Sequence, residues 1–345
     1  MASGPPYRPT VWALGGLPDR LIDTPITAVF LVLFIFGAAI HMTIFQFNKR
    51  RGHKFVFNGM IFGFCMSRIV TTSLKIASVS LPNNIRLAIA AQIFTAAGVI
   101  VVFIINLVWS QRILRSMHPN LGWHTSISLI FKTIYVLVIF TLAILITATV
   151  QSFFTLRQRT KTIDRDLQLY GATFLAIISF LPIPIVRLSY ALPRKSELEK
   201  FGQGRHRTKT TVLIVGTTLC CLGASFRCGT FWLRPVPLSQ PCPAYFSKTW
   251  FYVMNFGVEI LVVYFYAAMR VDLRFWVPNG AKGAGSYGGQ GSKAAAGTGT
   301  GTGTEGEDEE NEDEQVESRN GNGKWKHGEK ECREHGRVDS EDSEV

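Results

Sequence analysis

Seven long apolar segments alternate with short polar connections up to about residue 280 of this 345-residue chain. An apolar stretch of about 20 residues is long enough to cross the hydrocarbon core of a bilayer as an α-helix. The pattern therefore predicts an all-α integral membrane protein, a seven-transmembrane helix bundle. We expect the spans at 25–47, 55–79, 87–110, 126–150, 167–186, 210–232 and 250–269.

The charged residues between the spans indicate how the bundle is oriented. Sixteen Lys and Arg residues fall in the connections on the side of loop 187–209, against nine in the alternate connections. Because cytosolic loops carry an excess of positive charge, we expect the N-terminus outside and the C-terminus inside. Six of the seven tryptophans, Trp109 among them, flank predicted spans, where indole rings prefer the headgroup level.

Three regions follow from this arrangement: an extracellular N-terminal segment at 1–24, a membrane domain at 25–280 and a cytosolic tail at 281–345. Residues up to 280 carry a net charge of +20, whereas the tail carries −8. The tail is Gly-rich and then strongly acidic, and such a composition buries too little apolar surface to fold. We therefore expect a disordered tail. Asp23 and Pro25 predict the start of the first helix, with Asp23 as its cap.

Glu259, in the middle of the last predicted span, is the only acidic residue that the sequence places inside any span. An ionised carboxylate at that depth is costly unless it meets a cation, a hydrogen-bond donor or water. At about 1.5 Å of rise per residue, Arg68 in the second span comes to the same depth, so we predict that the two residues pair. The alternative is a structural ion pair that only fixes helix packing.

Three more polar side chains belong to the predicted site. Lys75 and Arg227 fall in the outer quarter of the membrane, and Asn255 shares the helical face of Glu259. We predict an outward-facing cavity for an anionic or polar ligand. Its ligand-binding residues would be Arg68, Lys75, Arg227, Asn255 and Glu259.

Catalytic and cofactor chemistry is not expected. A metal-dependent intramembrane hydrolase needs several converging His, Asp or Glu side chains, and the predicted spans hold only His41 and Glu259. We therefore expect no enzyme activity, no metal and no cofactor. Cys228 and Cys242 both fall near the outer surface and form a candidate disulfide, with two free thiols as the alternative.

Four stretches resemble a known family: HMTIFQFNKRRGHKF at 41–55, FCMSRIVTTSLKIA at 64–77, LVWSQRILRSMHP at 107–119 and YFYAAMRVDLRFWVPNG at 264–280. Over about residues 20–282, the chain resembles a fungal-specific family of seven-span membrane proteins of unknown function. Members of that family are sometimes labelled class C-like G-protein-coupled receptors. The resemblance implies a membrane fold and a receptor-like label, with no functional residues to carry over.

The function that we expect is receptor-like sensing of an unknown polar or anionic ligand. The ligand would perturb the region of Arg68 and Glu259, and the basic loop 187–209 would signal to a cytosolic protein. A transporter or channel for a small polar or anionic solute is the alternative, and a structural or lipid-organising protein is the third possibility. We expect membrane lipids as partners, no nucleic acid, and a location in the plasma membrane.

Overall fold

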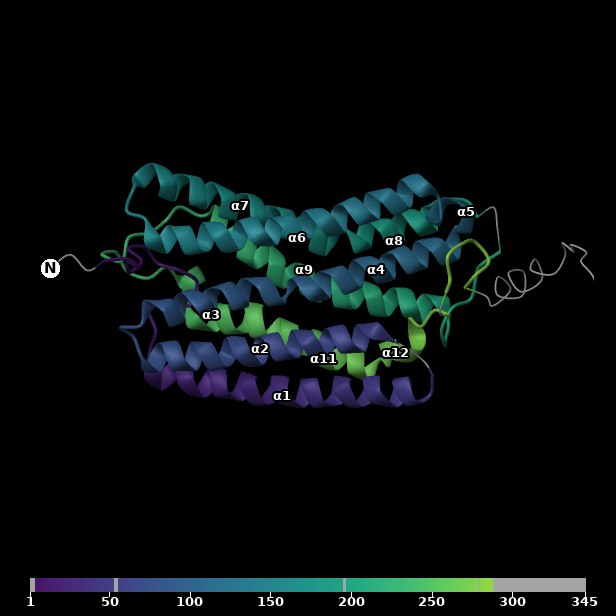
Figure 1. Cartoon of the computed structure of the whole chain (residues 1–345), viewed down its shortest axis with the longest axis horizontal. Coiled ribbons are helices and arrows are strands. Elements are labelled where there is room, and N and C mark those ends of the chain that lie inside the picture. Colours follow the sequence, from purple (N-terminus) through teal and green to yellow (C-terminus); the bar gives the residue numbers. More distant parts are fainter. Residues whose placement is uncertain (1–3, 53–54, 195–196, 279, 288–345) are drawn as a thin grey trace, which may run out of the picture. The chain divides into compact units, whose positions relative to one another are not determined.

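The computed structural model describes residues 4–52, 55–194, 197–278 and 280–287, so most of the predicted tail lies outside the described residues. Within these ranges, seven helical spans are long and apolar enough to cross a membrane, which confirms the all-α seven-span bundle (Figure 1). The spans are α1 (Arg20–Arg50), α2 (Val56–Ser80), α3 with α4 (Ile85–Gly98, Ile100–Met117), α6 (Thr125–Phe154), α7 with α8 (Gln158–Phe180, Pro182–Ala191), α9 (His206–Trp232), and α10, η2 and α11 (Lys248–Phe251, Tyr252–Gly257, Val258–Ala268). Three short helices complete the fold: α5 (Pro119–Gly122), η1 (Ala244–Phe246) and α12 (Val271–Arg274).

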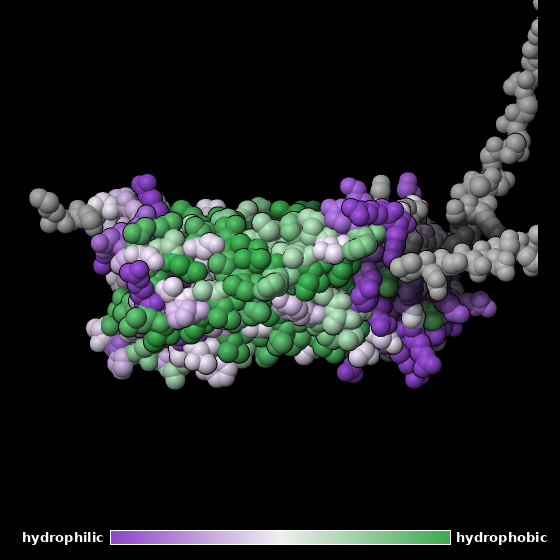
Figure 2. Space-filling view, turned by 90° about the horizontal axis from the view of Figure 1, so that it is seen from below, coloured by the Kyte–Doolittle hydropathy of each residue, from purple (hydrophilic) through white to green (hydrophobic). Residues whose placement is uncertain are grey.

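The flank of the bundle is apolar, as a lipid-facing surface requires. Large side chains such as Phe36 on α1 and Ile139 and Phe140 on α6 are each about 60% exposed. Figure 2 shows the band that they belong to, a broad hydrophobic zone between two more polar ends. An apolar surface of this extent is stable only when hydrocarbon or another protein covers it. The chain is therefore a multi-pass membrane protein.

The helix α4 lies at the centre of the bundle, between a layer with α1, α2 and α11 and a layer with α6, α7 and α8 (Figure 1). Its Trp109 is fully buried, stacked on Phe275 at 4.4 Å between ring centroids and edge-on to Tyr266 at 5.0 Å. Such aromatic pairs contribute about 0.5–1.5 kcal/mol each beyond their burial. Trp109 is therefore a core residue that joins α4 to α11 and to the residue after α12, and it is not exposed at the surface of the bundle.

The first span starts earlier than the sequence predicts. Asp19 is the N-cap and accepts a hydrogen bond from the Leu21 N–H at 2.9 Å, while Asp23 accepts one from the Asp19 N–H at 2.8 Å. This reciprocal pair fixes the helix start at Arg20. The predicted start at Pro25 with Asp23 as its cap is therefore wrong, and Asp23 is a buried residue inside α1.

Three other helix boundaries also differ from the predicted ones. α7 begins at Gln158, so Asp164 and Asp166 lie on a helix that the sequence analysis assigns to a loop. Likewise α8 continues to Ala191 and α9 begins at His206, which shortens the basic connection predicted at 187–209. Hydropathy marks only where hydrocarbon begins, whereas these helices continue with charged residues into the headgroup region.

Three spans are not continuous α-helices. Span 3 is broken between Gly98 and Ile100, span 5 between Phe180 and Pro182, and span 7 contains the π-helical turn Tyr252–Gly257. Of these three interruptions, only the one at Pro182 has a clear signal in the sequence, since proline lacks the N–H that a helix interior needs. Irregular backbone at membrane depth is tolerated where protein surrounds it. The breaks in spans 3 and 7 both lie beside buried charged residues.

Candidate functional site

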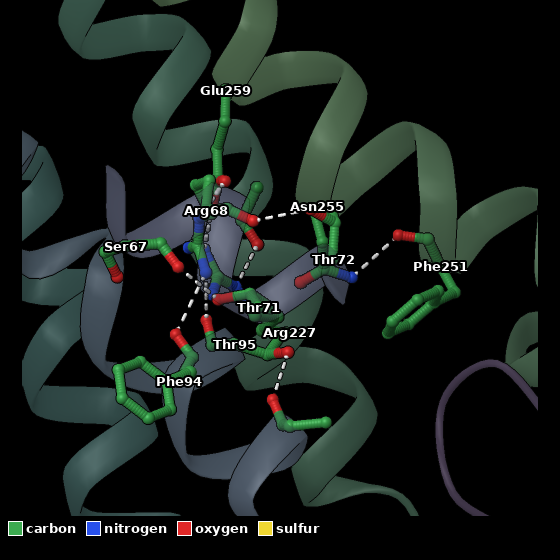
Figure 3. A network of polar contacts seen from close by, with 12 residues as sticks. Ser67, Arg68, Thr71, Thr72, Phe94, Thr95, Arg227, Phe251, Asn255 and Glu259 are labelled. Atoms are coloured by element: carbon green, nitrogen blue, oxygen red, sulfur yellow. Dashed lines mark hydrogen bonds and ion pairs between the residues drawn. The ribbon is translucent and has the colours of Figure 1, made fainter. Parts of the chain in front are cut away.

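Arg68 and Glu259 form a buried salt bridge between α2 and α11 (Figure 3). Arg68 Nη2 donates to Glu259 Oε1 at 2.7 Å, and Arg68 Nε lies 2.6 Å from Glu259 Oε2. The second contact lies outside hydrogen-bond geometry, so we count it as an ion-pair contact. The two side chains are 1% and 5% exposed. The pairing predicted from their common depth is therefore confirmed.

Arg68 also binds the end of the broken helix in span 3. Its Nη1 donates to the carbonyl oxygens of Phe94 and Thr95, both at 3.0 Å. Carbonyls in the last turn of a helix lack partners within the helix and form its negative end, so the guanidinium caps α3. One side chain thereby joins span 2, the break in span 3 and the carboxylate of span 7.

Gly98 makes this approach possible. A Cβ at this position would lie 2.8 Å from Ser67 Oγ and 3.1 Å from Arg68 Cζ, so any larger residue would displace the guanidinium. The sequence analysis does not identify Gly98. The available signal is a single glycine inside an apolar span, which indicates a close backbone approach without revealing the partner.

Arg227 on α9 is a second guanidinium at the same carboxylate. Its Nη2 lies 3.6 Å from Glu259 Oε1, beyond ordinary hydrogen-bond distance, and its side chain is 17% exposed. Arg68, Arg227 and Glu259, which we call the central cluster, thus hold two positive charges and one negative charge. The carboxylate is committed to Arg68, and Arg227 is held loosely.

The crevice beside the central cluster is small. Arg227 and Glu259 line it together with apolar side chains that include Met254 and Val258, and its cavity measures about 10 Å³. A cavity of that size has room for about one water molecule. The crevice at the central cluster is therefore much smaller than the open outward-facing cavity predicted from the sequence.

Two of the predicted ligand-binding residues have other partners. Lys75 Nζ lies 4.1 Å from the centroid of the Phe251 ring and 5.5 Å from that of Tyr252, which is cation–π geometry. Asn255 Nδ2 donates to the Phe251 carbonyl at 2.8 Å, within the π-helical turn. The structure therefore brings Arg68, Arg227 and Glu259 into contact, whereas the contacts found for Lys75 and Asn255 are with other residues.

A second group of polar residues, two of them buried and two partly exposed, lies nearer the outer surface. Asp23 Oδ2 accepts from Lys248 Nζ at 2.6 Å, and Asp23 Oδ1 accepts from Tyr252 Oη at 3.0 Å. Lys75 sits against the Tyr252 ring, so Asp23, Lys75, Lys248 and Tyr252 form one group, the outer cluster. Sequence reasoning missed its acid, because it assigned Asp23 to a helix cap outside the span.

The candidate disulfide does not form. Cys228 and Cys242 are both free thiols. Cys228 Sγ lies 3.6 Å from Thr173 Oγ1 on α7, whereas Cys242 is exposed in the following loop, with its Sγ 3.6 Å from the Pro243 carbonyl. The prediction is wrong because Cys228 faces the neighbouring helix. The alternative of two free thiols holds.

Comparison with known proteins gives a match for only part of this site. Searches of curated proteins and of solved structures find no match. One family model, described as a protein of unknown function (DUF3112), matches residues 195–276. That stretch includes α9, the last span and α12, so it contains Arg227 and Glu259 and leaves out Arg68. Over this region, the chain is similar to a family whose description assigns no function.

Proposed function

We propose that this protein is a receptor-like membrane protein in which a small anionic ligand binds Arg227 in competition with Glu259. The observation that carries the proposal is the central cluster, where two guanidinium groups share one carboxylate. Buried charges need compensation, and a second anion at Arg227 would supply it. Glu259 would remain paired with Arg68, whose contacts are shorter and more numerous.

Binding would change the spacing of two helices. Arg227 lies on α9 and Glu259 on α11, so a ligand that draws Arg227 away from Glu259 loosens the link between those helices. The segment before α9 is bonded to α12, which follows α11, because the Gln203 N–H donates to the Leu273 carbonyl at 2.8 Å. A change in spacing would thus reach the basic connection within 187–209, where we propose that a cytosolic signalling protein binds.

The ligand would enter by widening the crevice. Met254 and Val258 form part of its wall, and an unbranched Met side chain moves aside more readily than a branched one. The closed crevice would then be the ligand-free state, and the ligand would select a rarer open state. This scheme involves no catalytic step.

We place the protein in the plasma membrane, as a member of a fungal receptor-like family.

Thermal unfolding of the purified full-length protein tests the proposal. Sodium phosphate, acetate and succinate would each be added at constant ionic strength. We expect at least one of them to raise the midpoint by about 2 °C or more in the wild type, since a ligand that binds the folded state stabilises it. Arg227→Gln should abolish the rise, whereas Arg234→Gln, in the exposed outer loop, should retain it. An equal rise in both variants would contradict the proposal.

A transporter for a small anionic solute is the second candidate, and the discontinuous spans favour it. Spans 3 and 7 are irregular beside the central cluster, and transporters use broken helices of this kind at midmembrane sites. Uptake of radiolabelled succinate into proteoliposomes, lost in Arg227→Gln and in Glu259→Gln, would support this candidate. If neither uptake nor a thermal response occurs, a structural or lipid-organising role gains support.

A further inference from the structure

The inner end of the bundle is covered by the residues that follow the last span. Tyr287 is only 4% exposed, and its ring packs edge-on to Trp123 and tilted against Phe201, both at 5.6 Å between centroids. Glu199 accepts hydrogen bonds from the backbone N–H groups of Gly285 at 2.6 Å and of Tyr287 at 3.3 Å. Arg115, Trp123, Glu199 and Phe201 form the site that receives this segment, and we call it the inner socket.

The inner socket is held in shape by contacts that do not involve the segment. The Glu199 N–H donates to the Ser116 carbonyl at 3.0 Å, and Ser116 Oγ donates to the Glu199 carbonyl at 2.8 Å. The Arg115 guanidinium lies 4.1 Å from the centroid of the Trp123 ring, and Arg115 Nε donates to the Gly122 carbonyl at 3.2 Å. The socket would therefore keep its form after the segment leaves.

The segment at 281–287, by contrast, is held by few groups. It contains no helix, and it includes Gly283 and Gly285. It meets the socket through one buried ring, two N–H bonds to Glu199 and a side-chain hydrogen bond between Tyr287 and Arg115. Segments with so few buried contacts open at a small cost compared with the helices around them. Extended peptides are commonly bound in this way: a group on the protein accepts hydrogen bonds from the peptide backbone, and a neighbouring pocket holds one side chain.

Two basic groups indicate which other peptide would fit the inner socket. Burial raises the pKa of the Tyr287 phenol, while the nearby Arg112 and Arg115 guanidiniums oppose that rise. Arg112 otherwise donates to the carbonyl of Phe275. Once the segment leaves, the Arg115 guanidinium would face the emptied pocket beside two aromatic walls, with the charge of Arg112 nearby. An acidic peptide with an aromatic residue matches that surface in charge and in shape.

We propose that the inner socket binds an extended, acidic segment of a cytosolic protein through one aromatic side chain, and that residues 281–287 occupy the socket until this partner displaces them. The identity of the partner as a signalling protein rests on the proposed receptor function. The competition between the two segments does not, and it needs no ligand at Arg227. The two proposals can therefore fail separately.

Peptide binding to the full-length protein in nanodiscs tests this competition. The probe is a fluorescent peptide that copies residues 281–287, AKGAGSY, and its affinity is measured by anisotropy for the wild type and for Tyr287→Ala. Removal of the internal competitor should raise the apparent affinity at least ten-fold, since an occupied site binds in proportion to its free fraction. Tyr190→Ala, which removes a 42% exposed ring from the same end of the bundle, should have no effect.

Two further measurements decide the details. Glu199→Gln in the Tyr287→Ala background should lose most of the gained affinity, and the peptide AEGAGSY should bind more tightly than AKGAGSY at low salt. Thermal unfolding checks that each variant keeps a folded bundle. Equal affinity for the wild type and Tyr287→Ala, or no binding to the folded Tyr287→Ala protein, would overturn the proposal. Tighter binding of AKGAGSY than of AEGAGSY would overturn the acidic partner.

Discussion

The central and outer clusters are both built from one buried acid and more than one cation, yet they differ in access to water. In the outer cluster, Lys248 is 22% exposed, so it can turn toward solvent if Asp23 is lost. In the central cluster, Arg68 is 1% exposed and is fixed to both Glu259 and the end of α3. Depth in the bundle therefore decides how much each buried acid contributes to the stability of the fold.

The two acids also differ in how many hydrogen bonds their carboxylates accept. Asp23 accepts hydrogen bonds from a lysine, a tyrosine and the Asp19 N–H, so its carboxylate is well satisfied. Glu259 instead divides its charge between a close guanidinium and a distant one. The outer cluster thus resembles a helix clamp, and the central cluster keeps one cation available for another anion.

The largest effect should come from Glu259→Ala. This substitution leaves two guanidiniums in the bundle with no carboxylate, and loss of one partner of a buried pair typically costs about 3–5 kcal/mol. Chemical unfolding in detergent micelles, compared with the wild type, measures the loss. Stability within about 1 kcal/mol of the wild type would show that water or lipid reaches the cluster.

Asp23→Ala should cost less, about 1–2 kcal/mol, because it mainly removes hydrogen bonds of Lys248 and Tyr252. Lys248 can rehydrate, which limits the penalty. The same unfolding assay gives the value. A loss equal to that of Glu259→Ala would remove the distinction between the two clusters.

Gly98→Ala should cost about 1–3 kcal/mol, because the added methyl group would displace Ser67 and Arg68. Gly63→Ala is the matched control, since nothing lies within 4 Å of a Cβ built there and the glycine also belongs to a helix. Alanine generally stabilises a helix relative to glycine, so the control should be neutral or slightly stabilising. Equal losses for the two variants would argue against a close approach at Gly98.

The smallest effect concerns Asp272, at the inner edge of the bundle. Burial would raise the pKa of this carboxyl, but hydrogen bonds from Arg270 and from Asn48 outweigh it, so its pKa lies below the ordinary value. A carboxyl with a lowered pKa contributes stability above about pH 4, which is lost as the pH falls through the folded-state pKa.

Unfolding at pH 3 and at pH 6 for the wild type and Asp272→Asn isolates this contribution. The stability difference between the two proteins should shrink by less than about 1 kcal/mol at the lower pH, because the Arg270 side chain is half exposed. A difference that does not change with pH would mean that Asp272 is not an ionised partner of Arg270.

The sequence predicts most of the fold because hydropathy reports directly on burial in lipid. It also predicts the pair of Arg68 and Glu259, since one rise per residue gives the depth of each. Depth alone, however, does not say how each helix is rotated about its axis or tilted in the membrane. For that reason the sequence pattern groups Lys75 with Glu259, although the Lys75 ammonium lies over the Phe251 ring.

Other features depend on contacts between distant parts of the chain. Lys248 binds Asp23 from the last span, and no local pattern reveals that partner, whereas Asp19 lies only four residues before Asp23. The break after Gly98 has no proline to mark it, and it is stabilised by Arg68 from another span. Sequence patterns give the helices, whereas the tertiary structure gives their interruptions and caps.

Two double-mutant cycles test the central claim most directly, that Glu259 is committed to Arg68 and only loosely bound to Arg227. Unfolding free energies would be measured for Arg68→Ala, Arg227→Ala and Glu259→Ala, singly and in the two pairs that contain Glu259→Ala. We predict a coupling energy of about 2 kcal/mol or more for Arg68 with Glu259, and below about 1 kcal/mol for Arg227 with Glu259. Equal coupling of both arginines, or additivity of Arg68→Ala and Glu259→Ala, would contradict the account.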